Sequence, residues 1–289
     1  MTNGKNMNIL DAISKGIKLL SESLSDINPR FESELLLSYA IKKERIWLLL
    51  HGSDKLSEDD CNRFLGLVKR RADGEPFSYI TGIKEFMSLD FKVKEGVLIP
   101  RPDTETLVSH IIETFKNKNA LILDLCTGSG AIAVSLAKYL EDSFITAVDI
   151  SDVCIETAKE NAETNGVADR VDIVKKDILT GFSTDKQFDC IVSNPPYIKT
   201  EDIKTLMKDV KDFEPTLALD GGNDGLIFYR KISTLAKKLL KKDGILAYEI
   251  GHDQAQDVYN IMKNESFSEI DFVKDLAGIN RVIYGKYIL

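Results

Sequence analysis

The chain has 289 residues, of which 43% are hydrophobic and 29% charged, as in ordinary globular proteins with a substantial core. The net charge of -8 argues against a protein that grips extended nucleic acid by its phosphates, although a local basic groove could occur within it. No apolar run reaches the roughly 18 residues that span a bilayer, and the polar N-terminus lacks a signal-peptide pattern, so we expect a cytoplasmic protein without a membrane anchor.

The region from Asn8 to Gly74 has the apolar spacing of helices. This spacing covers 9–24 and 31–40, and a short apolar segment follows at 46–50. Ser57 and Asp60 then resemble a capping box that opens a further helix. We predict a small helical bundle, assigned to a domain of residues 1–75.

Residues 76–100 have a different pattern. Apolar and polar residues alternate over 89–93, which predicts a half-buried strand, and Glu95-Gly96 predicts a turn into a second strand over 97–99. We therefore expect a linker that contains a β-hairpin.

The segment Arg101-Pro-Asp-Thr-Glu105 is a stiff entry into a helix that runs to Phe115. It opens the third predicted region, residues 101–289. We expect Arg101, Thr104 and Glu105 near the mouth of this domain.

Beyond residue 120 the sequence alternates between strand and helix patterns. Helices are predicted over 131–140, 153–165 and 228–240. The predicted strands cover 120–125, 144–149, 171–174, 188–192, 245–250, 270–272 and 281–284. This alternation favours an α/β fold with a mostly parallel sheet, and the two final strands predict an antiparallel strand at its edge.

A glycine-rich loop follows the first of these strands. Gly128 and Gly130 allow a tight turn and a close backbone approach, and the next helix presents its N–H groups there. Asp149 ends the second strand, where an acid can accept both ribose hydroxyl protons of a nucleoside cofactor. This arrangement serves NAD and S-adenosylmethionine alike.

Two details favour S-adenosylmethionine. Cys126 stands where a dinucleotide fingerprint requires its first glycine, and Asp124 would repel a pyrophosphate but suits a cationic methionine group. Asp177 and Ile178, after the third strand, are expected to bound the adenine. The predicted cofactor-binding residues are Asp124, Cys126, Thr127, Gly128, Ser129, Gly130, Asp149, Asp177, Ile178 and Asn194. The four cysteines are widely spaced, so we expect no metal site and no disulfide framework.

Asn194-Pro195-Pro196-Tyr197 follows the strand predicted at 188–192. Both prolines lack an N–H group, so the turn is stiff and its carbonyls are available to a ligand. Asn-Pro and Pro-Pro are also common turn dipeptides. The place of the turn, in the crevice beyond the carboxyl ends of parallel strands, favours function, and we predict that all four residues are catalytic.

These features resemble a class I methyltransferase, and more narrowly the HemK/PrmC group of peptide chain release factor N5-glutamine methyltransferases. The resemblance covers nearly the whole chain. Its motifs are found at 76–82, 85–86, 98–105, 123–133, 193–198, 214–215, 218–222 and 224–225. Cys126 departs from the glycine that is commonest in the group.

The resemblance implies a Rossmann-like, seven-stranded, mostly parallel sheet and S-adenosyl-L-methionine as cofactor. It implies that the substrate is the glutamine of the Gly-Gly-Gln motif in release factors. The helical domain 1–75 would then provide a second binding site for the release factor, and 101–289 would be the methyltransferase domain. We expect a monomer without stable nucleic-acid binding. In this interpretation the Asn194 oxygen and the Pro195 carbonyl accept the two N–H groups of the substrate amide, and Tyr197 flanks it.

Two alternatives stay open. Nucleic-acid methyltransferases that act on exocyclic amino groups use the same Asn-Pro-Pro-Tyr motif and would stack a flipped base on Tyr197. A basic, aromatic-rich recognition domain is not evident in the sequence, which argues against this. A non-catalytic binding protein would be expected to lose Asn194 or Asp149, and both are present.

Overall fold

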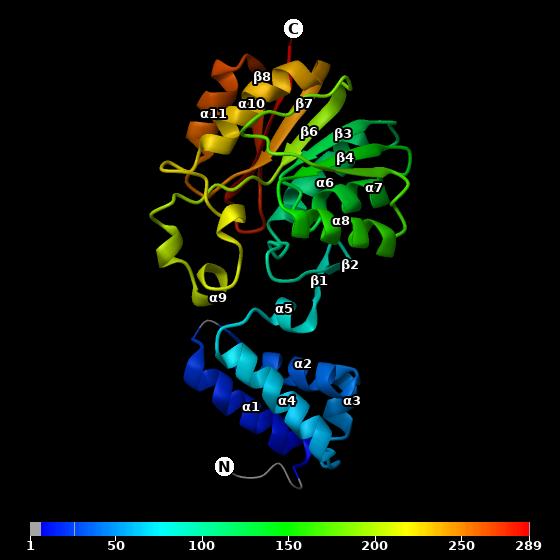
Figure 1. Ribbon diagram of the computed structural model, residues 1–289, viewed down its shortest axis with the longest axis vertical. Helices are drawn as coiled ribbons and strands as arrows, with labels where there is room; N and C mark the ends of the chain where they lie inside the picture. The colour runs from blue at the N-terminus through cyan, green and yellow to red at the C-terminus, as the bar shows by residue number, and fades with distance from the viewer. Residues whose placement is uncertain (1–6, 26, 289) are drawn as a thin grey trace. The chain divides into compact units, whose positions relative to one another are not determined.

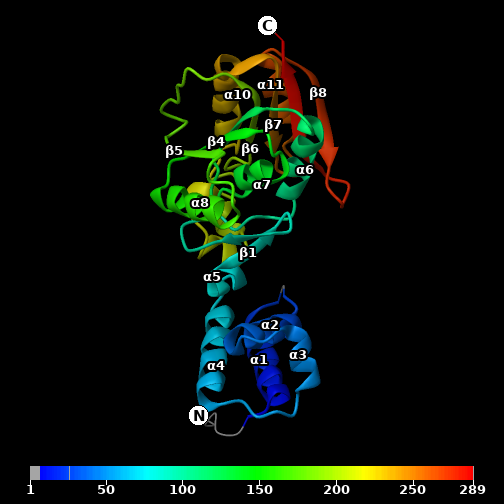
Figure 2. The same cartoon turned by 90° about the vertical axis from the view of Figure 1, so that its right-hand side faces the viewer.

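The computed structural model describes residues 7–25 and 27–288, which form two compact units. The first unit contains the chain up to Gly82 together with Met207–Phe213, and the second contains Ile83–Leu206 and the chain from Glu214 onward. Figures 1 and 2 show the helices of the first unit and the sheet of the second from two directions.

The first unit is the predicted helical bundle. Its helices are α1 (Ile9–Ser23), α2 (Pro29–Ile41), α3 (Arg45–Leu50), α4 (Glu58–Ala72), α5 (Phe77–Thr81) and α9 (Lys208–Lys211). Asn8, Asn28 and Ser57 cap α1, α2 and α4 by accepting backbone N–H groups. The apolar faces of these helices meet in a core that includes the buried side chains of Leu36 and Phe64.

The second unit contains a seven-stranded sheet with the order β5-β4-β3-β6-β7-β9-β8. The strands are β3 (Leu121–Leu125), β4 (Phe144–Asp149), β5 (Val171–Lys175), β6 (Phe188–Ser193), β7 (Leu240–Glu249), β8 (Phe267–Lys274) and β9 (Asn280–Tyr287). Strands β3 to β7 pair in parallel, and β9 runs antiparallel to both of its neighbours. This confirms the predicted fold class.

Helices cover both faces of this sheet, as Figure 2 shows. The helices of the unit are α6 (Thr104–Phe115), α7 (Ala131–Tyr139), α8 (Asp152–Thr164), α10 (Ile227–Leu239) and α11 (Ala255–Asn264), with short 3-10 turns at Ile203–Thr205 and Thr216–Ala218. Ile122 packs in the core under α6, α7 and α8, whereas its neighbour Leu123 packs under α10 and α11. Because both faces are buried, the central strands read as nearly continuous apolar runs.

The hairpin differs from the prediction. Its strands are β1 (Ile83–Phe86) and β2 (Leu89–Lys92), so the second strand expected over 97–99 is wrong. The two-residue turn between them is Met87-Ser88, and both residues have left-handed backbones, with φ of 51° and 57°. A tight hairpin turn requires positive φ, which asparagine and glycine favour. The residues Met87 and Ser88 therefore did not indicate a hairpin turn in the sequence. Gly96, which did indicate a turn, belongs to a separate one.

The antiparallel strand is also displaced from its expected place. β9 lies between β7 and β8, one position in from the edge, because the chain first forms the outer strand β8 and then turns back so that β9 pairs with both β8 and β7. Among the helices of residues 7–25 and 27–288, none combines the length and the apolar content needed to cross a bilayer.

Candidate active site

The carboxyl ends of β3, β6 and β7 lie next to one another. Leu125 of β3 pairs with Ser193 of β6, which in turn pairs with Tyr248 of β7. The strand order reverses between β3 and β6, and in open α/β sheets such a switch point opens a crevice for ligands. The loop after β3, Asn194 after β6 and Glu249 at the end of β7 are therefore brought together.

A cavity occupies this crevice, and it contains most of the predicted site. Nine predicted residues line it, namely Cys126, Thr127, Gly128, Ser129, Asp149, Asp177, Ile178, Asn194 and Pro196. Asp124, Gly130, Pro195 and Tyr197 are not part of the lining. Arg101 and Thr104 do line the cavity, as expected for its mouth, whereas Glu105 instead accepts the backbone N–H of Met87 in the hairpin turn at 2.8 Å.

The loop after β3 turns sharply by means of left-handed backbone conformations. Cys126, Gly128 and Gly130 have φ of 63°, 56° and 79°. A Cβ atom at Gly130 would lie 2.9 Å from the Cβ of Ala158, so only glycine fits there, whereas a Cβ at Gly128 would meet open space. Cys126 carries its side chain in a conformation that costs a non-glycine residue about 1 kcal/mol.

Asp149 closes the loop from the neighbouring strand. Its carboxylate accepts the N–H of Gly128 and the N–H of Ser151, each at 2.9 Å. Burial raises the pKa of Asp149, and these backbone donors oppose the shift. A carboxylate has about four lone-pair sites, which can be shared between these backbone donors and the hydroxyl groups of a ligand.

Asp124 is a fully buried carboxylate at the base of the loop. Its Oδ2 accepts the hydroxyl of Thr127 at 2.5 Å, but its Oδ1 is buried without a hydrogen-bond partner. Burial raises the pKa of Asp124 to about 7, and the negative charge of Asp149 adds to the shift. An unpaired buried carboxylate is costly, so this site would be stabilised by a cationic group. The residues present therefore fit the sulfonium and ammonium charges of S-adenosylmethionine.

The Asn-Pro-Pro-Tyr turn is held from two sides. Asn194 Nδ2 donates to the hydroxyl of Thr104, the first residue of α6, at 3.2 Å. The backbone carbonyl of Tyr197 accepts Gln254 Nε2 at 2.9 Å, and its hydroxyl lies 3.5 Å from Glu249 Oε1. Burial raises the pKa of the Tyr197 phenol well above its ordinary value, and Glu249 adds to the effect, so the phenol stays protonated.

A second glycine-containing segment packs against this turn. A Cβ at Gly221 would lie 2.8 Å from the Cα of Tyr197, and one at Gly225 would collide with the Tyr197 carbonyl. The backbone of Ile198 pairs with this segment through Leu219 O at 2.9 Å and the N–H of Gly221 at 2.8 Å. The Gly-Gly-Asn-Asp-Gly motif therefore acts by letting two backbones approach closely.

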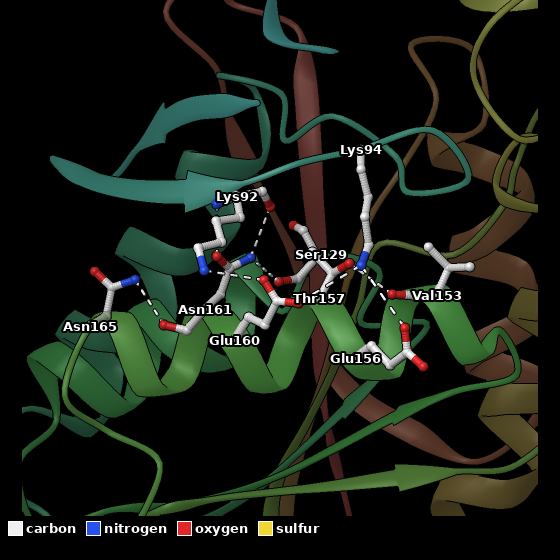
Figure 3. Close-up of polar contacts among 9 residues, drawn as sticks. All are labelled: Lys92, Lys94, Ser129, Val153, Glu156, Thr157, Glu160, Asn161 and Asn165. Atoms are coloured by element: carbon white, nitrogen blue, oxygen red, sulfur yellow. Dashed lines mark hydrogen bonds and ion pairs between the residues drawn. The ribbon is translucent and has the colours of Figure 1, made fainter. Parts of the chain in front are cut away.

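A buried asparagine joins the hairpin to the glycine-rich loop. Figure 3 shows Asn161 of α8 between strand β2 and Ser129. Its side chain accepts the N–H of Lys92 at 2.7 Å and donates to the carbonyls of Lys92 at 3.0 Å and Ser129 at 2.9 Å. Asn161 is fully buried, and these bonds position the loop from behind the cavity.

Comparison with known proteins agrees with this geometry. The model of the PrmC N-terminal domain matches residues 11–82, and that of the methyltransferase small domain matches residues 101–222. A release factor glutamine methyltransferase of Clostridium acetobutylicum is 44% identical over 96% of this chain and 98% of its own length. This chain belongs to the release factor glutamine methyltransferase family.

A second member of the family, from Clostridium botulinum, is 43% identical over 88% of this chain and 90% of its own length. Among solved structures, a methyltransferase of Pyrococcus furiosus aligns with a TM-score of 0.53 at 19% identity, over 79% of this chain and 99% of its own. That likeness shows the fold alone. The family resemblance inferred from the motifs is confirmed.

For this methyltransferase, the motifs did not reveal every residue around the cavity. Pro215 and Ala218 line it, although the sequence marked them only as similar to the family, and so does Leu217, which lies between these two motifs. Glu249 was treated only as part of the strand predicted at 245–250. The one signal for this residue in the sequence was a charge within an otherwise apolar predicted strand.

Proposed function

We propose that this chain transfers a methyl group from S-adenosyl-L-methionine to the side-chain amide nitrogen of the glutamine in the Gly-Gly-Gln motif of peptide chain release factors. The observation that carries the proposal is the placement of Asn194. Its amide nitrogen is engaged by Thr104, which leaves its oxygen for a ligand at the wall of the cavity. Family membership supports the same substrate class, and a substrate that acts in translation favours a cytoplasmic location.

The cofactor would be held by the loop after β3 and by the two carboxylates beneath it. Asp149 would accept the ribose hydroxyl protons, Asp177 and Ile178 would bound the adenine, and Asp124 would balance the positive charge. When bound, S-adenosylmethionine supplies an electrophilic methyl group on its sulfonium. The glycine conformations at 128 and 130 allow the backbone to approach it closely.

The task of the Asn-Pro-Pro-Tyr turn is to orient a poor nucleophile. An amide nitrogen is weakly nucleophilic because its lone pair is delocalised into the carbonyl. The Asn194 oxygen and the Pro195 carbonyl would accept its two N–H groups, and proline-rich backbone offers acceptors without competing donors. Tyr197 would flank the planar amide. Such positioning can lower a barrier by roughly 7–11 kcal/mol.

Replacing Asn194 with alanine tests this role. Turnover should fall about 100-fold, while the Kd for S-adenosylmethionine should change little, because positioning and not cofactor binding is lost. Asn223, an exposed asparagine in the Gly-Gly-Asn-Asp-Gly segment, provides the matched alanine control and should retain activity. An equal loss of turnover and cofactor affinity in the Asn194 variant would contradict the assigned role.

We also propose a division of labour between the domains. Residues 1–75 form a substrate-recognition domain, 76–100 a linker and 101–289 the methyltransferase domain of a monomer. Leu49 and Leu50 at the end of α3 are 53% and 77% exposed, and apolar side chains so exposed suit a protein partner. Changing both to serine should raise the KM for a release factor and leave kcat unchanged. An unchanged KM would argue against this surface.

The substrate is tested with labelled S-adenosylmethionine. A purified release factor, its variant with alanine in place of the Gly-Gly-Gln glutamine, duplex DNA and ribosomal RNA are incubated separately with the enzyme. Label on the native factor alone is expected. Label on DNA or RNA would support the alternative amino-group chemistry on nucleic acid and overturn the proposed substrate.

A further inference from the structure

Gln254 is a buried side chain that the mechanism above does not use. It directly precedes α11, is 5% exposed and does not line the cavity. Its Nε2 donates to the backbone carbonyls of Tyr197 at 2.9 Å and Gly225 at 3.3 Å. Its Oε1 accepts the N–H of Gly251 at 3.1 Å and faces the Tyr229 hydroxyl at 3.3 Å. Both ends of the amide therefore have partners within the protein.

These partners fix the orientation of the Gln254 amide. The backbone N–H of Gly251 can only donate, so it must face the amide oxygen. The carbonyls of Tyr197 and Gly225 can only accept, so they must face the amide nitrogen. A reversed amide would place like groups against each other at all three contacts. The side chain therefore joins two backbone carbonyls through a single NH2 group.

Gly225 makes room for this contact. A Cβ atom at Gly225 would collide with the Tyr197 carbonyl and lie 2.7 Å from Gln254 Nε2. Its backbone is also left-handed, with φ of 73°, which glycine adopts without strain. The last glycine of the Gly-Gly-Asn-Asp-Gly segment thus serves the Gln254 side chain as well as the backbone of the turn.

The Asn-Pro-Pro-Tyr turn is held at both of its ends. Before it, Ser193 ends β6, is fully buried and donates its hydroxyl to a backbone carbonyl of β3 at 2.6 Å. The two prolines make the turn itself stiff. A stiff segment takes the direction that its two ends give it. The bond to the Tyr197 carbonyl therefore also sets where the Asn194 oxygen and the Pro195 carbonyl lie.

We propose that Gln254 is a positioning residue that acts through the Tyr197 backbone to hold the substrate-binding acceptors of the Asn-Pro-Pro-Tyr turn in place. This inference rests on the proposed function of that turn. Without the NH2 group, the carbonyls of Tyr197 and Gly225 lose the donor that they share, and the end of the turn can move. The substrate still binds, but its amide nitrogen is no longer aimed at the methyl group.

Replacing Gln254 with glutamate tests the proposal in the full-length enzyme. Gln254→Glu keeps the shape but puts an acceptor in place of the NH2 group. At pH 8 and saturating cofactor, kcat should fall roughly 100-fold. The Kd for S-adenosylmethionine should change by less than about threefold, because Asp149 and Asn161 hold the 126–130 loop. Gln256→Glu, at an exposed residue of α11, adds the same charge and should behave as wild type.

Comparison with Asn161 separates positioning from a general loss of stability. Asn161 is also a buried amide of the sheet unit, but it binds Ser129 in the cofactor loop instead of the turn. Asn161→Leu should therefore raise the Kd for the cofactor, whereas Gln254→Leu should lower kcat when the cofactor is saturating. Both should lower the thermal midpoint. A Gln254→Leu or Gln254→Glu enzyme that is folded and has the kcat of wild type would overturn the proposal.

The pH profile of Gln254→Glu adds a readout that a purely structural role would not change. A protonated carboxyl group keeps one O–H donor, whereas an ionised one has none. The ratio of variant to wild-type kcat should therefore rise as the pH falls from 8 to 6. Tyr229, which faces this position, stays protonated in that range because burial raises the pKa of its phenol. A ratio that is independent of pH would count against the proposal.

The failure of this proposal is distinguishable from the failure of the proposed function. If the wild-type enzyme does not label a release factor, the proposed function fails. If the wild-type enzyme labels it and the Gln254→Glu variant labels it equally fast, only the role of Gln254 fails.

Discussion

The interior of the helical unit and the cavity edge of the sheet unit treat buried carboxylates in opposite ways. Glu34, 1% exposed on α2, is bound by Arg30 at 3.0 Å and by Arg45 at 2.7 Å. Burial disfavours its charge, but the two arginines outweigh that effect and lower its pKa. Asp124 and Glu249 each keep one oxygen without a partner, and burial raises the pKa of both to about 7.

This difference does not extend to every buried polar side chain of the sheet unit. Asn161 lies in the sheet unit but behind the glycine-rich loop, and its three hydrogen bonds use both its oxygen and its nitrogen. Asn161 holds the fold together, and its full set of partners avoids the free-energy cost of an unpaired buried group. Asp124 and Glu249 do not line the cavity, but each keeps one buried oxygen without a hydrogen-bond partner, and a positively charged group nearby would stabilise the ionised carboxylate.

The largest stability effect is expected at Asn161. Asn161→Leu removes three hydrogen bonds and leaves the backbone groups of Lys92 and Ser129 without their partners. This should lower the free energy of unfolding by about 4 kcal/mol. Asn165→Leu, at the residue that directly follows α8, is the matched control and should cost about 1 kcal/mol. Urea unfolding measures both. Equal losses in the two variants would show that the buried bonds are not special.

A somewhat smaller loss is expected at Glu34. Glu34→Gln removes the charge that both arginines share and should destabilise the helical unit by about 3 kcal/mol, seen as faster hydrogen exchange of α2 amides. Glu22→Gln removes an exposed partner of Lys18 and should change little. If Glu34→Gln were harmless, paired carboxylates in this unit would not contribute to its stability.

Asp124 should show the opposite trend. The folded-state pKa of about 7 lies above the ordinary value of 3.8, so its ionisation destabilises the fold progressively as the pH rises between these values. Asp124→Asn avoids that cost, and its stability relative to wild type should increase by about 2 kcal/mol from pH 5 to pH 8. Its affinity for S-adenosylmethionine should fall. A stability difference that does not vary with pH would contradict the buried-charge argument.

The smallest effect is expected at Cys126, where the strain lies in the backbone. Cys126→Gly and Cys126→Ala both remove the thiol, but only glycine relieves the left-handed conformation. The glycine variant should therefore be the more stable of the two by about 1 kcal/mol in thermal unfolding. The reverse order would mean that glycine's freedom in the unfolded chain outweighs the strain.

Much of the fold and the site could be predicted from local pattern. The strands β3, β4 and β6 and the helix after the glycine-rich loop are visible because apolar runs, glycine spacing and capping residues act over short distances. The Asn-Pro-Pro-Tyr turn and the acid at Asp149 were visible for the same reason. Nine of the predicted site residues line one cavity.

By itself, the sequence determined the alternation of strands and helices, the family and most of the predicted site residues that line the cavity, because short contiguous motifs carry each of these features. Only the tertiary structure decided the rest. The hairpin turn at Met87-Ser88 has no sequence signal, and pairing with β1 sets it. Asn161 donates to the carbonyl of Ser129, and Asn194 donates to the hydroxyl of Thr104, although the two residues of each pair lie far apart in the chain. Strand order and helix packing create these contacts, and neither is encoded in a local pattern.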